Sequence, residues 1–450
     1  MIEKKRSGKC SCSVDFLYFC AICDVSKPES LLTNLDIYSL IMKKLKATMM
    51  GLAAAATLFC ACNNAQKTTE PALTKSGINP ADFDTLVAVA YDAEAGKFVN
   101  NPDEAKEVKL YTLTNANGME VCITNFGGRI VSIMVPNRDG KFVDVACGFD
   151  KVENYFPWNY ETDFGSSVGR YANRINAGEY TYEGQKVTLD KNNNGVASLH
   201  GGYTGWQYQV YDVVEATDQS LTLQRISPDG DNRFPGKVDV KVKFELTDDN
   251  AIVINYDGTA DAPTVLNMTN HTYFNLSGDL NNTIKESLLT INADNYTPAD
   301  DNLIPTGEIR PVANTAFDFR TAKAIGTNFA DGNKELESVG GGYDHNWVLN
   351  TKGNQNEVAV TMTDPRSGIK LEMFTNEPGV QCYTANFQDG TRPGKGGIMY
   401  QKHSAICLES QKFPDAPNKY TLPGWELCNP FVTPEKPYHS YCKYAFSVEK

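Results

Sequence analysis

The chain has 450 residues, which is enough for one large domain or two of ordinary size. Hydrophobic residues make up 41% of it and charged residues 22%, as is usual for a globular protein. The formal net charge is −13 and basic blocks are few and short, which argues against nucleic acid as a partner.

A segment near the N-terminus resembles an export signal. Residues 42–46 are basic, and residues 47–61 carry no charge over a length too short for a stable membrane anchor. Cys62 follows as the acylated cysteine does in a bacterial lipoprotein signal, with cleavage by an ordinary signal peptidase as the alternative. We therefore expect residues 42–62 to be a lipoprotein-type signal peptide. The protein is then exported, periplasmic, and held at a membrane only through the lipid on Cys62.

The residues on either side of this signal are expected to lie outside the fold. An export signal is read at the N-terminus, so residues 1–41 are expected to be an upstream extension assigned in error, with Met42 as the initiator. Four cysteines in that extension leave a zinc site as the alternative. Residues 63–80 are polar and turn-rich, which suits a tether between membrane and domain.

Six cysteines follow the signal, at scattered positions and without a CxxC pair. Most of them lie in apolar, strand-like surroundings, which indicates buried small side chains, although an isolated disulfide is compatible with an oxidising compartment. These residues are Cys122, Cys147, Cys382, Cys407, Cys428 and Cys442.

From Lys109 onward the pattern is one of short strands joined by turns. Residues 238–246 alternate apolar and polar side chains, and a second apolar run at 251–254 follows a polar turn, which predicts a hairpin. Residues 358–362 alternate in the same way, while residues 81–108 indicate a loop or a loose hairpin. No apolar periodicity of helical length occurs after the leader. The pattern predicts one all-β domain, a large sandwich of antiparallel sheets.

One carboxylate stands inside an apolar strand pattern. Glu409 follows Leu408 in the run 406–411, which leads directly into a proline-rich turn at 413–418. Burial costs a carboxylate several kcal/mol unless it is paired or acts as a weak acid, and a raised pKa suits a general base near neutral pH. A glutamate bonded to neighbouring backbone is the alternative.

Three further segments place charged or imidazole groups among glycines, amides and aromatic residues, a composition that suits the binding of hydroxyl groups and of an apolar ring face. They are residues 169–175 with 198–202, residues 267–276, and residues 341–347. Taken singly, Arg174, Asp344, His200 and His271 also fit structural roles. The sequence has no HxH or HExxH spacing, so no metal site is expected after the signal.

Together and in this order, the segments resemble those of the aldose 1-epimerase (galactose mutarotase) family. The motifs are Asn173-Arg174-Ile175, Ser198-Leu199-His200-Gly201-Gly202, Thr269-Asn270-His271-Thr272-Tyr273-Phe274-Asn275-Leu276, Tyr343-Asp344-His345-Asn346-Trp347 and Leu408-Glu409-Ser410-Gln411 with Pro414-Asp415-Ala416-Pro417-Asn418. The resemblance implies a galactose mutarotase-like supersandwich over residues 81–450. It also implies an enzyme that interconverts the α and β anomers of hexoses such as glucose and galactose without a cofactor.

Carried over residue by residue, the resemblance implies a general base, a general acid and a set of sugar ligands. Glu409 corresponds to the base, His271 to the acid and His200 to a group that assists at the ring oxygen. The implied substrate ligands are Asn173, Arg174, Asp344 and Gln381. Residues 88–107 look like an insertion relative to the family. It leaves the catalytic and substrate-binding residues intact and is expected to alter the rim of the site or an oligomer surface. The sequence predicts no oligomeric state.

Other readings remain open at this point. A non-catalytic carbohydrate-binding β-sandwich lipoprotein needs no acid–base pair, yet Glu409 and His271 are both present. A retaining glycosidase that uses Glu409 and Asp344 requires carboxylates about 5–5.5 Å apart and leaves His271 without a role. A phosphosugar epimerase would need an additional Arg/Lys cluster to bind the phosphate, and the sequence shows none.

Overall fold

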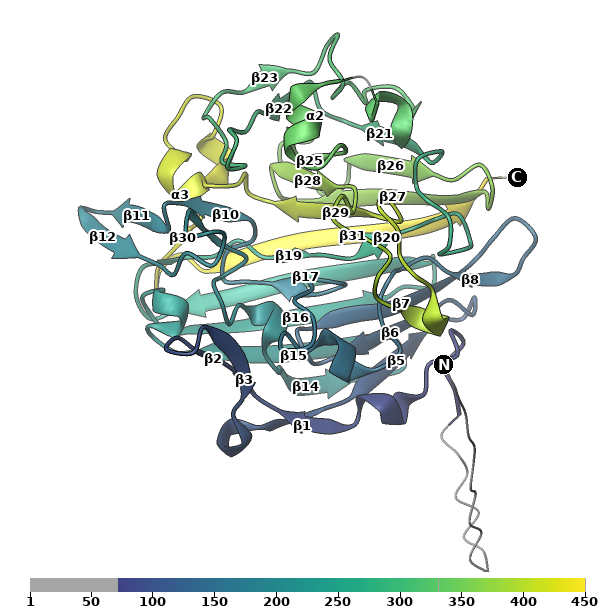
Figure 1. The fold of residues 1–450 in the computed structure, drawn as a ribbon, viewed down its shortest axis with the longest axis horizontal. Coiled ribbons are helices and arrows are strands. Elements are labelled where there is room, and N and C mark those ends of the chain that lie inside the picture. Colours follow the sequence, from purple (N-terminus) through teal and green to yellow (C-terminus); the bar gives the residue numbers. More distant parts are fainter. Residues whose placement is uncertain (1–71, 331, 450) are drawn as a thin grey trace, which may run out of the picture. The chain divides into compact units, whose positions relative to one another are not determined.

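The structure, a computed structural model, describes residues 72–330 and 332–449. The predictions for residues 1–41 and 42–62, including Cys62, and for most of the tether lie outside the described residues. Antiparallel strands dominate the rest, as Figure 1 shows, and confirm the all-β class. Within the described ranges, helical structure is limited to short elements: α2 (Lys334–Ser338), α3 (Ala416–Lys419) and the 3₁₀ turns η1 (Pro80–Phe83), η2 (Pro102–Glu104), η3 (Val152–Tyr155), η4 (Trp206–Tyr208), η5 (Asp231–Arg233), η6 (Ile325–Asn328), η7 (Lys395–Gly397) and η8 (Glu426–Cys428).

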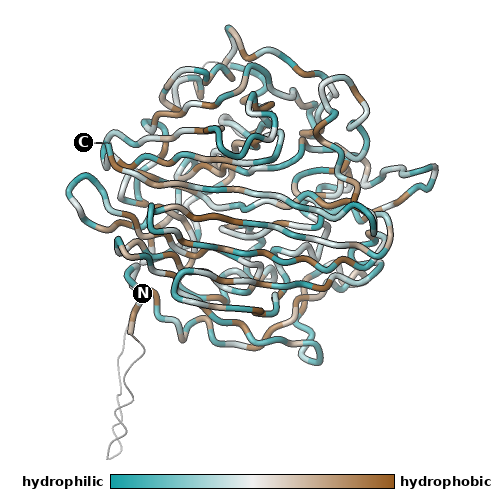
Figure 2. Tube along the Cα trace, turned by 180° about the vertical axis from the view of Figure 1, so that it is seen from behind, coloured by the Kyte–Doolittle hydropathy of each residue, from teal (hydrophilic) through white to brown (hydrophobic). Residues whose placement is uncertain are grey.

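The largest sheet has nine strands and contains the hairpin predicted from the sequence. Its order is β14 (Asp212–Ala216), β15 (Ser220–Ser227), β16 (Val238–Leu246), β17 (Ala251–Ala260), β31 (Tyr438–Val448), β27 (Ile369–Thr375), β26 (Val360–Thr363), β21 (Leu288–Ile291) and β24 (Lys323–Ala324). On β16 every second side chain is buried, from Val238 to Leu246. Figure 2 shows the same alternation of hydrophobic and hydrophilic residues along the long strands. Each buried aliphatic side chain contributes about 1.5–3 kcal/mol of hydrophobic stabilisation.

A six-stranded and a four-stranded sheet complete the main framework. The six-stranded sheet has the order β20 (Tyr273–Phe274), β29 (Ile406–Gln411), β28 (Gly379–Tyr383), β25 (Asp344–Val348), β22 (Asn295–Thr297) and β23 (Arg310–Pro311). The four-stranded sheet has the order β5 (Leu110–Thr114), β6 (Glu120–Thr124), β7 (Arg129–Pro136) and β8 (Phe142–Asp144). Apolar side chains from all three sheets share one core cluster, to which Ile133, Val242 and Leu408 belong.

Short two-stranded pairs hold the segments that lie between the sheets. They are β1 (Thr85–Val87) with β4 (Lys106–Val108), β2 (Val89–Asp92) with β3 (Lys97–Asn100), β9 (Ser167–Val168) with β19 (Thr269–Asn270), β10 (Arg174–Asn176) with β13 (Ala197–Leu199), β11 (Glu179–Tyr182) with β12 (Gln185–Thr188), and β18 (Thr264–Val265) with β30 (Phe431–Val432). Two of these pairs, β9–β19 and β10–β13, carry or directly precede several of the candidate site residues.

The packed domain begins before residue 81, where the sequence placed its start. Ile78 and Phe83 are both buried in a core cluster, and the backbone N–H of Lys75 donates to Oε1 of Glu120 at 2.6 Å. The predicted end of the tether therefore falls inside packed structure. Residues 88–107 form the β2–β3 hairpin and lead into β4, in agreement with the loose hairpin expected there.

All six cysteines among the described residues are free and buried, as expected from their apolar surroundings. Burial raises the pKa of the Cys382 and Cys407 thiols well above the usual range, so these groups are unreactive as thiolates. No helix within the described ranges has the length and apolar character needed to span a membrane.

Candidate active site

Strand register places Glu409 in a row of polar side chains. On β29, Ile406 and Leu408 belong to the core cluster between the sheets, so Glu409, one residue further, points to the opposite face. Glu409 pairs across the ladder with Gln381 of β28, and Gln381 pairs with Asn346 of β25. Three neighbouring strands thus present a carboxylate and two carboxamides side by side, all nearly fully buried.

His271 faces this row from the β9–β19 pair. Its backbone is fixed at both ends, because its N–H donates to the carbonyl of Ser166 at 2.8 Å and its carbonyl accepts from Gly165 N at 3.0 Å. The side chain lies 5.2 Å from the Tyr273 ring in a nearly parallel arrangement. The imidazole is therefore held by the backbone and by a ring contact, and its Nε2 is turned toward Glu409.

His200 and Arg174 come from the β10–β13 pair. Nδ1 of His200 accepts a hydrogen bond from the backbone N–H of Asn173 at 3.1 Å. The guanidinium of Arg174 donates to Oδ1 of Asn193 at 3.2 Å and to Oδ1 of Asn173 at 3.4 Å. Gly201, at φ +84°, permits this packing, since a Cβ there would lie 2.1 Å from the carbonyl oxygen of Gly169. Gly201 therefore lets the two backbone segments approach closely beside His200.

Nε2 of His271 lies 3.5 Å from Oε1 of Glu409, and both side chains are almost fully buried. Burial raises the pKa of Glu409 well above its usual value, with the charges of Asp344 and Asp163 acting in the same direction and Arg174 opposing them. Burial also lowers the pKa of His271. The rise brings the Glu409 carboxylate toward the range in which protons are exchanged at neutral pH, and the fall of the His271 pKa narrows the difference between the two groups.

The seven catalytic and substrate-binding candidates named from the sequence form one connected group. The two imidazoles of His200 and His271 meet edge to face with ring centroids 5.4 Å apart. Nε2 of Gln381 donates to Oδ1 of Asp344 at 2.7 Å, and Gln381 adjoins Glu409 through the strand register. Arg174 is joined to Asn173, and Asn173 to His200, by the hydrogen bonds given above.

Several buried polar atoms of this group, and one of the neighbouring Asn346, have no protein partner. They are Oε2 of Glu409, Nδ1 of His271, Oε1 of Gln381 and Oδ1 of Asn346. A buried polar atom without a partner is costly, and such atoms concentrate where a ligand supplies the missing hydrogen bonds. Acceptors together with a guanidinium and imidazoles suit a ligand that carries several hydroxyl groups.

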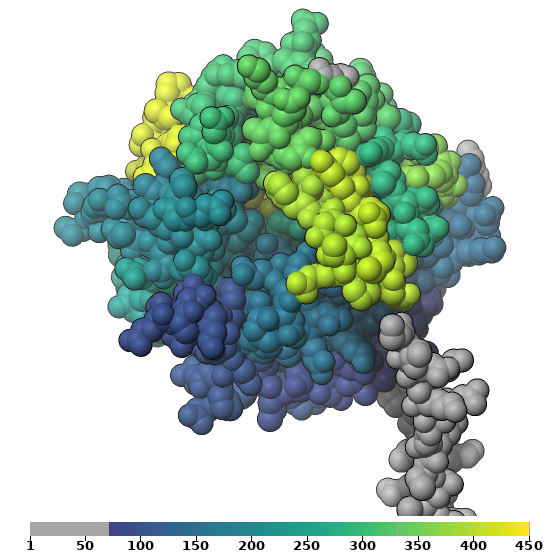
Figure 3. All heavy atoms as spheres, viewed as in Figure 1, coloured from purple at the N-terminus to yellow at the C-terminus, as the bar shows by residue number. Residues whose placement is uncertain are grey.

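A cavity of about 220 Å³ adjoins His200 and contains residues that the sequence did not single out. Asp163, Phe98 and Tyr203 line it with His200, and Phe98 comes from the β2–β3 hairpin. The insertion at 88–107 therefore contributes to a wall beside the site. Figure 3 shows the hollowed face, where the yellow-green segment near residue 400 lies across the front beside blue-teal segments.

Asp163, His200 and His271 are close enough to be weighed as a cation site, since one ligand atom of each lies within 4.8 Å of the others. The hydrogen bond from Asn173 N–H to Nδ1 of His200 argues against it. That bond uses the Nδ1 lone pair and leaves the proton of the neutral ring on Nε2, so neither nitrogen is free to bind a metal ion. The donor set is better suited to holding and moving protons.

His345 and His403 have structural surroundings. Nδ1 of His345 accepts from the backbone N–H of Asp344 at 3.1 Å, and the ring packs edge to face on Phe317. His403 bonds to the carbonyl oxygen of Thr384 at 3.0 Å. His439 lies exposed beside Asp257, 2.8 Å away.

Comparison with known proteins extends the similarity across most of the domain. The family model described as aldose 1-epimerase matches residues 109–431. The aldose 1-epimerase of Escherichia coli K12 is 37% identical over 346 residues, which are 77% of this chain and 97% of that protein. The galactose mutarotase of Mus musculus is 40% identical over 334 residues, 73% of this chain and 92% of that protein.

Solved structures show the same fold. An aldose epimerase homologue from C. elegans aligns with a TM-score of 0.69 and 28% identity over 76% of this chain and all of that chain. The galactose 1-epimerase of Lactobacillus acidophilus NCFM aligns with a TM-score of 0.66 and 25% identity over 82% of this chain and 99% of that chain. The supersandwich expected from the sequence is confirmed.

Proposed function

The chain belongs to the aldose 1-epimerase family and interconverts the α and β anomers of aldoses, and we propose that Glu409 is its general base and His271 its general acid. The observation that carries this assignment is the buried, facing pair, with Nε2 of His271 3.5 Å from Oε1 of Glu409. A sugar-binding protein without catalysis has no need of a buried carboxylate and imidazole in this arrangement.

In the proposed reaction, Glu409 removes the proton of the C1 hydroxyl while His271 donates a proton to the ring oxygen. The bond between C1 and the ring oxygen breaks, and C1 becomes an aldehyde carbon. After rotation about the C1–C2 bond, the ring hydroxyl attacks the other face of the aldehyde. Glu409 returns its proton to the carbonyl oxygen and His271 recovers one from the attacking hydroxyl. Each acid or base contributes about 10²–10⁴-fold to the rate.

The residues around the pair supply orientation and charge. Arg174 lowers the pKa of Glu409 and so opposes the effect of burial. We assign Arg174, Asp344, Asn173 and Gln381 to the sugar hydroxyls, because they belong to the connected group that contains Glu409 and His271, and Oε1 of Gln381 has no protein partner. His200 then assists at the ring oxygen beside His271. Glucose and galactose are the proposed substrates.

The substitution Glu409→Gln tests the assignment. The amide keeps the shape of the side chain and cannot accept the C1 proton, so catalysed mutarotation of fresh α-glucose or α-galactose should fall at least about 10²-fold in polarimetry. Glu372→Gln, on β27 of the other sheet, is the matched control and should retain full activity. Near wild-type activity in Glu409→Gln with an unchanged circular dichroism spectrum would exclude Glu409 as the base.

We further propose that the protein is exported to the periplasm and anchored by a lipid on Cys62. The support is the sequence pattern of a basic start, an uncharged stretch and a terminal cysteine in residues 42–62. Intact mass of protein extracted from membranes should show a chain that begins at an acylated Cys62. An unmodified chain that begins at residue 1 would contradict both the signal and the assignment of residues 1–41.

A further inference from the structure

Asp163 lies beside His200 and His271 on a loop that hydrogen bonds hold in place. The buried guanidinium of Arg129 donates to the carbonyl oxygens of Thr162 at 3.0 Å and of Phe164 at 2.9 Å, so it fixes the backbone on both sides of Asp163. The carbonyl of Asp163 itself accepts from the backbone N–H of Ser166 at 3.0 Å. These three hydrogen bonds hold the backbone of the loop in place and so fix the orientation of the Asp163 side chain.

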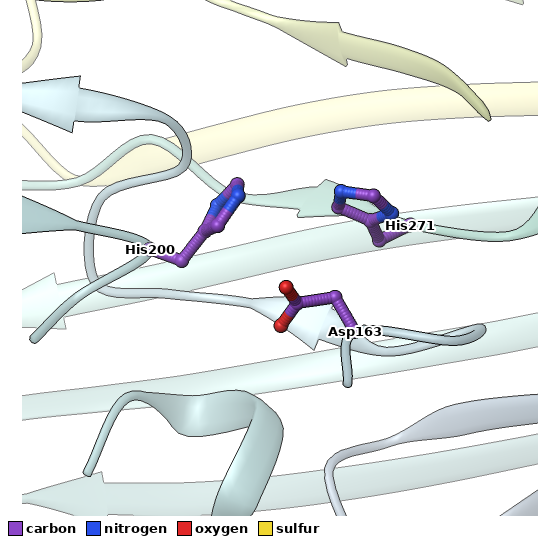
Figure 4. Close-up of side chains that lie close together, drawn as sticks. All are labelled: Asp163, His200 and His271. Carbon is purple, nitrogen blue, oxygen red and sulfur yellow. The ribbon is translucent and has the colours of Figure 1, made fainter. Parts of the chain in front are cut away.

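The Asp163 side chain points toward the imidazoles of His200 and His271. Figure 4 shows the Asp163 carboxylate lying between the rings of His200 and His271, and a carboxylate oxygen falls within 4.8 Å of a nitrogen of each ring. Oδ1 of Asp163 is buried and has no hydrogen-bond partner. The Asp163 side chain as a whole is half-buried, and a carboxylate oxygen shielded from water favours a positive charge nearby. An imidazolium in this position supplies such a charge.

We propose that Asp163 is a positioning residue for the general acid: its negative charge, on a loop fixed by Arg129, stabilises the protonated imidazole of His271 at its buried position. The proposal rests on the assignment of His271 as the acid under the proposed function. It extends that assignment by naming the group that keeps a buried histidine able to carry a proton.

The electrostatic surroundings of His271 agree with this role. Burial lowers the pKa of His271, and the Asp163 charge is the leading influence that raises it, with a smaller contribution from Asp344. Arg129 lowers it. The other titratable groups that face the ring are Glu409 on β29, His200 after β13, Tyr273 on β20 and Tyr383 on β28.

The neighbours of His271 respond to the same charge. Burial lowers the pKa of His200 to about 4, and Asp163 is again the first influence in the opposite direction. For Glu409 the Asp163 charge raises the pKa further, in addition to burial and Asp344. Removing the charge of Asp163 should therefore lower the pKa of both members of the catalytic pair, not of the histidine alone.

The test is the pH dependence of kcat/KM for Asp163→Asn, measured by polarimetry on the full exported chain. Because both pKa values fall, both limbs of the bell-shaped profile should move to lower pH, and activity on the alkaline side should drop about tenfold for each unit by which that limb moves. Glu161→Gln is the matched control. Glu161 lines the same cavity but is exposed, so its profile should keep the wild-type limbs.

Three outcomes would overturn the proposal. A uniform loss of activity with unshifted limbs would assign Asp163 a structural role only. An unchanged pH profile would show that the charge of Asp163 does not affect the pKa values of Glu409 and His271. Inhibition by micromolar Zn²⁺ that is lost in Asp163→Asn, without a shift of the limbs, would favour a cation site. Failure of the proposed function is distinguishable from all three, since it would show as full activity in Glu409→Gln.

Discussion

Two buried glutamates in this molecule have opposite surroundings. Glu377 and Glu409 are 2% and 1% exposed. Both oxygens of Glu377 accept from Nζ of Lys412, at 3.1 and 2.9 Å. Glu409 has one oxygen without a partner and a single histidine nitrogen 3.5 Å from the other. Lys412 follows β29 directly, so the partner of Glu377 lies only three positions after Glu409 along the chain.

The difference distinguishes Glu377, a carboxylate that stabilises the fold, from Glu409, a carboxylate available for the reaction. A buried carboxylate that accepts a hydrogen bond on each oxygen from a lysine ammonium has its desolvation cost offset by that charge. A buried carboxylate left partly unsatisfied has a raised pKa and is ready to accept one. Burial alone does not identify the functional glutamate; the missing hydrogen bonds do.

The largest expected effect on stability comes from breaking the satisfied pair. Lys412→Met keeps the aliphatic stem and leaves Glu377 buried without its cation, so the free energy of unfolding should fall by about 3–5 kcal/mol in a denaturant titration. Lys370→Met is the matched control, because Lys370 and Glu372 form a partly exposed pair 3.1 Å apart that contributes less than about 1 kcal/mol.

A second substitution shows whether the loss arises from the uncompensated charge. Adding Glu377→Gln to Lys412→Met removes that charge and should recover most of the lost stability. If the double variant is as unstable as Lys412→Met, lost packing rather than an orphaned carboxylate accounts for the effect.

The smallest stability change is expected at the functional glutamate. Glu409→Gln removes a carboxylate whose burial is not offset, so the free energy of unfolding should stay within about 1 kcal/mol of wild type or rise. The same denaturant titration measures it. A loss as large as that of Lys412→Met would show that Glu409 is held by interactions that stabilise the fold.

The amino-acid pattern predicted most of the framework and the members of the site, for local reasons. Alternating burial along β16 follows directly from the period of two in its side chains. Glu409 was recognisable because a carboxylate inside an apolar run is unusual. The start of the domain was placed too late because Ile78 is an isolated apolar residue whose burial depends on distant strands.

The part that could not be predicted arises from tertiary contacts. Nothing local to Asp163 marks it, apart from its place beside the buried Phe164. Its proximity to His200 and His271 requires the loop that Arg129 fixes, and Arg129 lies 34 positions earlier, on β7. The contribution of Phe98 to the cavity wall likewise depends on where the β2–β3 hairpin folds back.

A double-mutant cycle measured by polarimetry tests the central claim most directly. The variants are Glu409→Gln, His271→Asn and the two combined, with the spontaneous rate subtracted. If the two groups act as one proton-transfer unit, each single change should cost about 10²–10⁴-fold in kcat, and the combination should be no slower than the slower single variant. Losses that multiply, or a single variant with near wild-type kcat, would contradict the paired acid–base mechanism.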